Sequence, residues 1–374
     1  MPDFLELVER GKQGRLKLYV GFAAGVGKTY RMLEEAHALK DRGVDAVIAF
    51  VETHARAETQ ALVAGLPFVP RRVFSYRGVD IEELDLEAVL ARKPQVAFVD
   101  ELAHTNAPGC VNKKRYQDVE ALLTAGIHVI AAVNIQHLES LNDVVSRATG
   151  VAVRETVPDA FFARADQIVN LDLSVEDLHD RLRAGKIYAP EKIESALTGF
   201  FQRDHLSTLR ELALREVAER LDRSPRTPTA HERPRTAGRV MVALSSFPPR
   251  ARMLLRRGTR IAGRLNTDWF VVYVETPREA PNRIDAEAQR HLLANLELAR
   301  ELGAEVKRVQ AADPVKGLID FARSHAVGMV LVGRSRLPRW KQWLGLSHDQ
   351  RMVREAEGLD VLVVAFDDPE GSNP

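Results

Sequence analysis

An alternation of short apolar runs with amphipathic segments constrains the fold of this chain more than any other feature. In the first half the apolar runs are LKLYVG (16–21), DAVIAFVE (45–52), QVAFVDE (95–101) and IHVIAAVN (127–134). Continuous apolar runs of this length are typical of strands that are buried on both faces of a parallel sheet. The segment KTYRMLEEAHALKDRG has helical periodicity and ends at Gly43, the expected C-cap. The pattern therefore predicts an α/β domain in which helices wrap a parallel sheet.

The same alternation begins again in the second half. Strand-like runs occur at RVMVALS, DWFVVYVET, AEVKRV, GMVLVG and DVLVVAF, and helical patterns at about 250–264, 285–302 and 314–325 separate the first four. Five strands with crossover helices predict a second, doubly wound α/β domain. Between the halves lies DRSPRTPTAHERPRTAG, with three prolines and four arginines, which is typical of an exposed linker. We predict domains at 1–221 and 239–368, a linker at 222–238 and a tail at 369–374.

The region after Val151 carries a weaker strand signal, and 190–220 is mainly helical in pattern. We expect this region to form a helical extension of the first domain. One apolar stripe runs along LSTLRELALREVAERL, at Leu206, Leu209, Ala213, Val217 and Leu221. Such a stripe packs either on its own domain or on a second copy of the chain in a homodimer, and the pattern leaves both open.

Composition excludes several classes of function. The net charge of +1 gives no strong field that would recruit nucleic acid. Cys110 is the only cysteine, which excludes intrachain disulfides and cysteine-rich zinc sites and favours a reducing cytoplasm. The N-terminus lacks the apolar core of a signal peptide, and nowhere do roughly 18 apolar residues run together. We therefore expect a cytoplasmic protein without membrane insertion.

The stretch GFAAGVGKT resembles a phosphate-binding loop but has unusual spacing. Such a loop requires Gly, four residues and then Gly-Lys-Ser/Thr, and here Phe22 occupies the first glycine position while Gly21 lies one residue too early. A strand precedes the stretch and a helix follows it, so backbone N–H groups and a helix N-terminus would face a phosphate. We predict a nucleotide site at these five residues: Gly25, Val26, Gly27, Lys28 and Thr29. Lys28 would reach the β and γ phosphates and the Thr29 hydroxyl would bind Mg²⁺.

Polar side chains follow the other predicted strands of the first domain. Asp100 and Glu101 end the strand VAFVDE, where Asp100 would bind Mg²⁺ and Glu101 would position a water molecule. Further polar residues follow the second and fourth strands and the Asp-Glu pair: Glu52, Thr53, His54, Arg56, Asn134, Gln136, His137, His104, Thr105 and Asn106. The carboxyl ends of parallel strands form a ligand crevice, although each of these residues can equally be a helix cap or a structural contact.

These residues carry a family resemblance. The segments GVGKTYRMLEEAH, VETHARAETQALVAGL, ARKPQVAFVDELAHTNAPG, AGIHVIAAVNIQHLESLNDVV, TGVAVRETVPD and LRAGKIYAPEKIESAL resemble, in that order, the N-terminal cytoplasmic region of the bacterial potassium-responsive sensor kinases of the KdpD family. The resemblance covers 17–220. It implies a sensory domain that binds ATP and Mg²⁺, and a small residue in place of the first loop glycine is common in that family.

The second half is similar to the universal-stress-protein-like domain that follows in this family. Many members of that superfamily bind ATP, and the resemblance implies ligand contacts at Ser245, Gly333 and Ser347. Arg336 replaces an expected glycine of the phosphate loop, which favours a diphosphate-like anion over the usual ATP cradle. In some relatives this domain binds cyclic di-AMP, and we expect ATP or such a nucleotide messenger as its ligand.

The sequence ends without the membrane helices and histidine-kinase core of the family. We therefore expect a regulatory sensory module of the potassium and osmotic two-component system, which acts on a histidine-kinase core or membrane sensor protein. The alternative is a phosphotransferase or ATPase with a P-loop that acts on a small molecule. A strand that ends in Asp-Glu beside GVGKT also resembles thymidine-kinase-like enzymes, but one cysteine cannot form their structural zinc site.

Overall fold

The computed structural model describes residues 13–54, 56–76, 78–223, 238–244, 251–265, 267–277, 285–334 and 347–365. The chain divides into two compact units, of which the first comprises Met1–Val157 and Phe161–Ala218 and the second comprises Pro158–Ala160 and Glu219–Pro374. The predicted domain limits at 221, 238 and 368 stay predictions.

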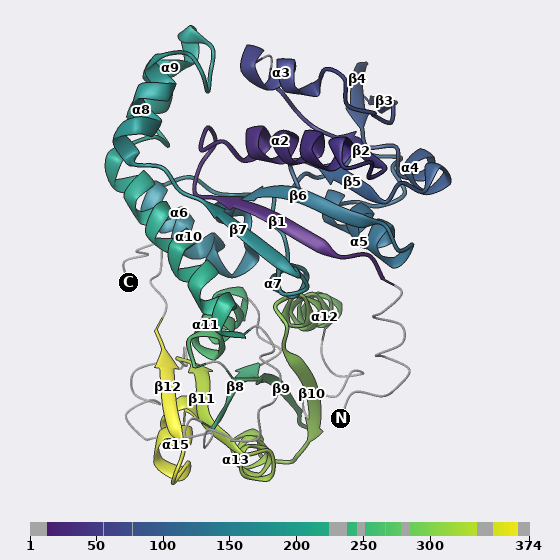
Figure 1. Ribbon diagram of the computed structural model, residues 1–374. Coiled ribbons are helices and arrows are strands. Elements are labelled where there is room, and N and C mark those ends of the chain that lie inside the picture. The colour runs from purple at the N-terminus through teal and green to yellow at the C-terminus, as the bar shows by residue number, and fades with distance from the viewer. Residues whose placement is uncertain are drawn as a thin grey trace. The chain divides into compact units, whose positions relative to one another are not determined.

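The first unit contains a five-stranded parallel sheet in the order β2-β5-β6-β1-β7. Its strands are β1 (Leu16–Gly21), β2 (Ala46–Phe50), β5 (Val96–Val99), β6 (His128–Asn134) and β7 (Gln167–Leu171). The first four coincide with the apolar runs, so the predicted α/β fold is confirmed. β1 lies between β6 and β7, and the carboxyl ends of β1, β5 and β6 are therefore adjacent (Figure 1).

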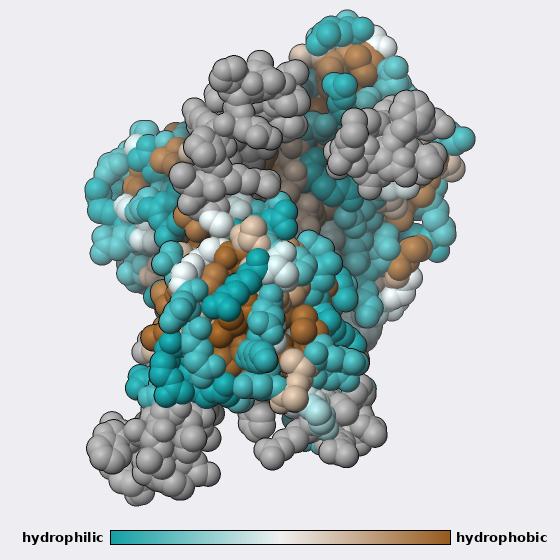
Figure 2. All heavy atoms as spheres, turned by 90° about the horizontal axis from the view of Figure 1, so that it is seen from below, coloured by the Kyte–Doolittle hydropathy of each residue, from teal (hydrophilic) through white to brown (hydrophobic). Residues whose placement is uncertain are grey.

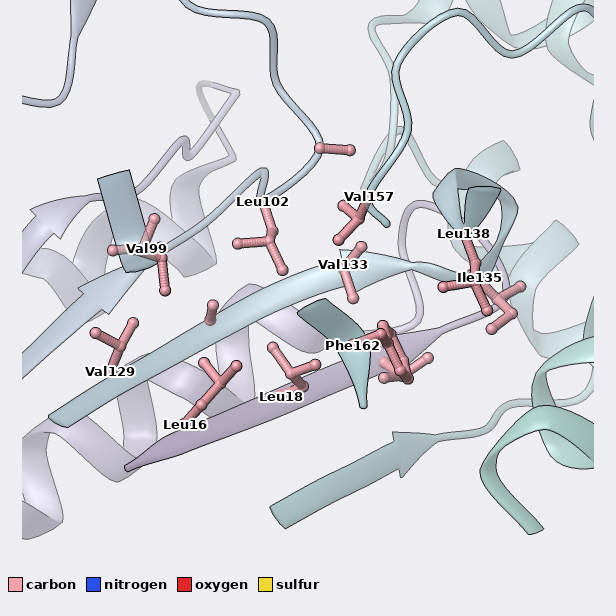
Figure 3. Packing of buried hydrophobic residues seen from close by; sticks show 14 of the residues in the cluster. Leu16, Leu18, Val99, Leu102, Val129, Val133, Ile135, Leu138, Val157 and Phe162 are labelled. Carbon is pink, nitrogen blue, oxygen red and sulfur yellow. The ribbon is translucent and has the colours of Figure 1, made fainter. Parts of the chain in front are cut away.

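Helices cover both faces of this sheet. Along β1 the side chains alternate: Tyr19 packs with Met32 and Leu33 of α2, whereas Leu18 and Val20 belong to the core on the other face. That second core also contains side chains of β6, shown beside those of β1 in Figure 3. Both faces are dry, which explains why the sequence shows continuous apolar runs rather than alternation. The helices of this region are α2 (Lys28–Asp41), α3 (Ala57–Val63), α4 (Leu86–Arg92), α5 (Arg115–Thr124), α6 (Asn142–Thr149), α7 (Asp159–Phe162), α8 (Val175–Arg183), α9 (Pro190–Thr198) and α10 (Arg203–Arg223), with 3-10 turns at Ile135–His137 and Glu139–Leu141.

Two features of the first unit escaped the sequence analysis. β7 (QIVNL) is flanked by acidic residues and is only partly buried, so it lacks a strong apolar signal, yet it pairs with β1 along its length. The antiparallel hairpin of β3 (Arg72–Tyr76) and β4 (Val79–Glu83) has mostly exposed side chains and turns at Gly78, whose φ is +79°. Neither element buries enough apolar surface to stand out in a sequence.

The predicted apolar stripe lies on α10. Leu206, Leu209, Ala213 and Val217 are all buried in the core of the first unit, as expected for a helix that packs on its own domain. The side chain of Leu221 lies outside the described residues. These four side chains therefore do not offer a dimer surface, and the homodimer stays a prediction.

The second unit contains a parallel sheet in the order β10-β9-β8-β11-β12, which confirms the doubly wound fold. Its strands are β8 (Arg239–Leu244), β9 (Trp269–Glu275), β10 (Glu305–Gln310), β11 (Val327–Gly333) and β12 (Asp360–Val364). α11 (Ala251–Arg264) and α12 (Ala286–Glu301) cover one face, and α13 (Pro314–Ser324) and α15 (His348–Glu355) cover the other. At residue Gly258 of α11 a Cβ atom would lie 2.5 Å from Val242 Cγ2, so glycine permits close helix–sheet packing there.

On the face drawn in Figure 2, hydrophilic residues surround separate patches of hydrophobic ones. Within the part of the chain that the structure describes, no helix has the length and apolar character needed to span a membrane.

Candidate functional site: a phosphate-loop cavity

The turn from β1 into α2 shows why the loop motif has unusual spacing. Phe22 is 1% exposed and packs in the core, and its φ is not positive, so the first motif position accepts a side chain. The close approach occurs at Gly21 instead, where a Cβ atom would lie 2.4 Å from Val26 Cγ2 and 3.3 Å from Lys28 Nζ. Gly25 and Gly27 have φ of +89° and +101°, which favour glycine. The required small residue thus lies one position earlier than the motif expects.

Lys28 is buried beneath this loop. Its Nζ donates a hydrogen bond to the Ala23 carbonyl at 3.0 Å and another to Asn134 Oδ1 at the end of β6. Burial lowers the pKa of Lys28 to about 8, and Arg56 lowers it further while Asp100 opposes the shift. The ammonium is therefore held in a dry place without a carboxylate within ion-pair distance among the described residues. A buried cation of this kind is stabilised by an incoming anion.

Thr29 and Asp100 lie together across the loop. Thr29 Oγ1 donates to Asp100 Oδ2 at 2.8 Å, and the other oxygen of Asp100 accepts from the Glu101 N–H at 2.8 Å. α2 begins at Lys28 without a side-chain cap, so its first N–H groups face the loop. The structure thus brings together the predicted magnesium residues Thr29 and Asp100. No group of three or more His, Cys, Asp or Glu side chains suited to a metal occurs among the residues described, so a magnesium ion here would need water or phosphate oxygens as further ligands.

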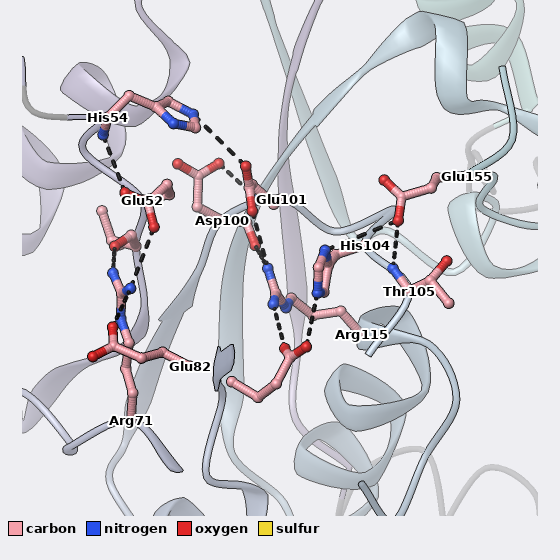
Figure 4. Close-up of polar contacts among 12 residues, drawn as sticks. Glu52, His54, Arg71, Glu82, Asp100, Glu101, His104, Thr105, Arg115 and Glu155 are labelled. Atoms are coloured by element: carbon pink, nitrogen blue, oxygen red, sulfur yellow. Dashed lines mark hydrogen bonds and ion pairs between the residues drawn. The ribbon is translucent and has the colours of Figure 1, made fainter. Parts of the chain in front are cut away.

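Glu101 follows Asp100 directly and has a left-handed backbone conformation with φ of +52°. Its carboxylate lies 3.4 Å from Arg115 Nη1 and 3.7 Å from His54 Nε2 (Figure 4). Arg115 is fully buried, stacks 3.7 Å from the Phe50 ring centroid and pairs with Glu83 Oε2 at 2.8 Å. Glu101 is thus anchored through a buried arginine to the hairpin strand β4.

Glu83 is the centre of this buried network. It is 1% exposed and accepts hydrogen bonds from His104 Nε2 at 2.9 Å, from the Ala107 N–H at 2.8 Å and from Arg115. Burial alone would raise the pKa of Glu83, but His104, Ala107 and Arg115 together lower it. The sequence left open whether His104 senses the γ phosphate or is a structural residue. Its hydrogen bond to the buried Glu83 supports the structural role.

The other polar strand ends have separate partners. Glu52 accepts from Arg71 at 3.2 Å and from the His54 N–H. His137 contacts the Glu155 carbonyl through Nδ1 at 2.9 Å, and burial lowers its pKa. The Oε1 atom of Gln136 is buried and has no partner among the described residues. Of this set, Asn134 is bonded directly to Lys28.

These groups surround a cavity of about 1100 Å³ at the carboxyl ends of the strands. Gly25 to Thr29, Asp100, Glu101, His54, Arg56 and His137 line it, together with residues that the sequence analysis did not select: Asp172, Leu173, Arg181 and Lys186. Arg181, on α8, donates from Nη1 to the Gly25 carbonyl at 3.0 Å. No sequence signal marks Arg181, because only the placement of α8 brings it to the loop.

The predicted ligand residues of the second unit are only partly described. Gly333 ends β11, and Ser347 is the N-cap of α15. The Ser347 side chain is fully buried, and its hydroxyl has no hydrogen-bond partner among the described residues. Ser245 and Arg336 lie outside the described residues. The ligand roles of all four stay predictions.

Comparison with protein families gives two matches. Residues 12–221 match a family model described as KdpD, the osmosensitive K⁺ channel His kinase sensor domain. Residues 236–365 match the universal stress protein family, the fold expected for the second unit.

Several proteins with the name of the sensor protein KdpD are similar to this chain. The sensor protein KdpD of Escherichia coli is 44% identical over 372 residues, which cover 98% of this chain and 41% of that protein. A protein of Synechocystis that carries the KdpD sensor name is 42% identical over 354 residues, which cover 95% of each chain. KdpD of Mycobacterium tuberculosis is 43% identical over 359 residues. The chain spans about two fifths of the length of the E. coli and M. tuberculosis relatives.

Solved structures of universal stress proteins are also similar to part of the chain. One, in complex with cAMP, has 21% identity and a TM-score of 0.28, and the match covers 35% of this chain and 98% of that one. Another, from Archaeoglobus fulgidus in complex with dAMP, has 19% identity and a TM-score of 0.25 over 34% of this chain and 96% of that one.

Proposed function

This chain belongs to the KdpD sensor-domain family, and on that premise we propose that its first unit binds ATP with Mg²⁺ and reports occupancy to a histidine kinase. The observation that carries the proposal is Lys28, a buried ammonium without a carboxylate partner among the described residues, at the start of α2 and beside the Thr29–Asp100 pair. Phosphate oxygens would supply the missing negative charge. In bound ATP the N–H groups of the loop and of α2 would face the phosphates.

Thr29 and Asp100 would hold the Mg²⁺ ion, which supplies charge neutralisation between the β and γ phosphates. Their oxygen atoms suit a hard cation, and their present hydrogen bond places both on one side of the loop. Glu101 would orient a water molecule towards the γ phosphate, so slow hydrolysis is compatible with this site. A sensor needs only occupancy, however, and turnover is not part of the proposal.

The second unit is proposed to bind a nucleotide, either ATP or a messenger such as cyclic di-AMP. Support comes from its universal-stress-protein fold and from the buried hydroxyl of Ser347 at the start of α15, which has no hydrogen-bond partner among the residues that the structure describes. The family description supports a histidine-kinase core as the partner that receives the signal, in the cytoplasm and in response to potassium or osmotic stress.

Calorimetric titration of the wild type and Lys28→Ala with MgATP tests the first site. We expect affinity to fall about 10- to 100-fold in the variant, because hydrogen bonds to charged groups contribute about 1.5–3 kcal/mol. Lys192→Ala is the matched control, since Lys192 is exposed on α9. Equal affinity in the wild type and in Lys28→Ala would contradict the proposal. A thermal-shift panel of ATP, ADP, cyclic di-AMP and cyclic di-GMP then identifies ligands of either unit.

A further inference from the structure

Arg56 is a cavity residue outside the phosphate-loop motif. It follows β2 as the N-cap residue of α3 and lines the cavity. Its Nη2 donates to the Ile187 carbonyl at 3.1 Å. Its Nε is buried and has no hydrogen-bond partner among the described residues. An N–H donor left unsatisfied in a buried place is costly unless a ligand completes it.

The charges around the cavity separate into two groups. Arg31 pairs with Glu34 at 2.9 Å, and Lys186 pairs with Glu58 at 2.8 Å. Three other cations that line the cavity have no ion-pair partner among the described residues: Lys28, Arg56 and Arg181. The cavity lining also carries carboxylates, among them Asp100 and Glu101, so it is these three cations, rather than the net charge of the cavity, that suit phosphate oxygens.

Arg56 follows β2, the strand beside the one that precedes Asp100. β2 and β5 are neighbours, with Phe50 opposite Val99, so the chain leaves β2 next to Asp100. Burial lowers the pKa of Arg56, while Tyr188 and Asp100 oppose that shift. Arg56 in turn acts on Lys28, whose pKa it lowers in addition to the effect of burial. Arg181 instead contacts the Gly25 carbonyl, in the loop before Lys28.

We propose that Arg56 binds the terminal phosphate of a nucleoside triphosphate and so makes this site select triphosphate over diphosphate. The assignment rests on the proposed function. Lys28 would contact both β and γ phosphates, whereas the Nε–H of Arg56, which has no partner within the described part of the chain, would find an acceptor only when the γ phosphate is present. A guanidinium also offers the planar donor geometry that phosphate oxygens accept well.

The bond to Ile187 gives this contact a structural consequence. Ile187 packs against the loop so closely that a Cβ atom on Gly25 would lie 2.2 Å from its Cδ1. Arg56 thus joins the γ-phosphate position to the chain between α8 and α9. If Arg56 served only to hold Ile187, its loss would weaken ATP and ADP binding alike.

The test compares MgATP and MgADP affinities by calorimetry for the wild type, Arg56→Gln and Arg56→Lys. We expect Arg56→Gln to lose about 10- to 100-fold in ATP affinity while ADP affinity stays within about twofold, from the contribution of one charged hydrogen bond. Arg56→Lys keeps the positive charge but not the planar N–H donors of the guanidinium, so its ATP affinity should fall by less than that of Arg56→Gln. Arg164→Gln is the control, because Arg164 pairs with Glu120 on the surface, outside the cavity.

Each outcome decides a separate point. An unchanged ratio of ATP to ADP affinity in Arg56→Gln would overturn the assignment, whether both affinities fall or neither does. A wild type that binds neither nucleotide would reject the proposed function itself, and this assignment with it. Circular dichroism and melting curves of both Arg56 variants confirm that each is folded.

Discussion

At the scale of single residues, the burial of the Lys28 ammonium favours the binding of an anion at this site. The ammonium is 8% exposed, and its hydrogen bonds to Ala23 and Asn134 replace water only in part. Burial lowers its pKa from 10.5 to about 8. The folded protein therefore holds this proton less tightly than the unfolded chain does. A bound phosphate would raise the pKa of Lys28 again, because a nearby negative charge favours the protonated ammonium.

Because of this pKa shift, we predict that charged Lys28 lowers the free energy of unfolding of the ligand-free protein by an amount that depends on pH. Between pH 8 and 10.5 the unfolded chain binds more protons, so the wild type gains stability as pH rises through this window. We expect the free energy of unfolding of Lys28→Met, relative to wild type, to fall by about 2 kcal/mol from pH 7 to pH 9.5. Denaturant unfolding of the wild type and of Lys28→Met at both pH values measures this difference in the free energy of unfolding.

The control for this prediction is Lys192→Met, an exposed lysine on α9. The pH dependence of the Lys28→Met difference should exceed that of the Lys192→Met difference. A difference between Lys28→Met and wild type that stays constant over this range would show that Lys28 is not desolvated in the folded protein.

At the scale of elements, Arg115 joins three pieces of the first unit. It begins α5, pairs with Glu83 at the end of β4 and lies 3.5 Å from the Asp100 carbonyl after β5. The hairpin β3–β4 has few buried side chains of its own, so we expect the Arg115–Glu83 ion pair to contribute strongly to holding the hairpin against the rest of the first unit. Breaking a buried pair from one side leaves a charge without a partner, which is more costly than losing the attraction.

Arg115→Met is therefore expected to reduce the free energy of unfolding by about 3–5 kcal/mol. The double variant Glu83→Gln/Arg115→Met should lose less than Arg115→Met alone, because it removes the stranded carboxylate while leaving an acceptor for the Ala107 N–H. Denaturant titration of the single and double variants gives the coupling energy.

An exposed pair provides the comparison for this cycle. Arg72 and Glu87 lie 2.9 Å apart with side chains 48% and 68% exposed, and Arg72→Met should cost less than about 1 kcal/mol. An Arg115→Met variant no less stable than Arg72→Met would mean that the Glu83–Arg115 pair does not stabilise the hairpin.

At the scale of the whole molecule, each unit has hydrophobic cores of its own. The core of the first unit includes side chains from α8 and α10 that follow the sheet in sequence: Leu178, Leu182, Leu206 and Leu209. All four have exposures of 0%. Burial of four leucines contributes about 6–12 kcal/mol, which is comparable with the net stability of a domain. These helices are therefore part of the first unit.

Two fragments test this conclusion. We expect residues 1–223 to unfold in a single cooperative transition, because the fragment retains the sheet and α8 to α10. A fragment of residues 1–172 should lose cooperative unfolding, since the apolar face that these helices cover would be exposed. Circular dichroism during thermal and urea unfolding distinguishes the two. Equally cooperative transitions in both fragments would show that the helices are dispensable for the core.

The sequence by itself determined the elements and the centre of the site. Apolar runs with both faces dry can hardly form anything but buried parallel strands, so β1, β2, β5, β6, β8, β9 and β11 were predictable. β10 and β12 are only partly buried and were predictable from the repeated alternation of strands and helices. Lys28 and Thr29 are adjacent in the chain, and Asp100 ends a neighbouring buried strand, so their meeting required only that the strands be parallel.

Tertiary structure alone decided the remainder. β7 and the β3–β4 hairpin gain their place through pairing rather than through apolar character. Arg181 reaches the Gly25 carbonyl from 156 positions away, and Arg115 meets Glu83 across 32 positions. The need for glycine at Gly21 likewise depends on how Val26 and Lys28 fold back over it. The local pattern records the period and burial of each segment, whereas these contacts depend on the strand order, which a single sequence does not encode locally.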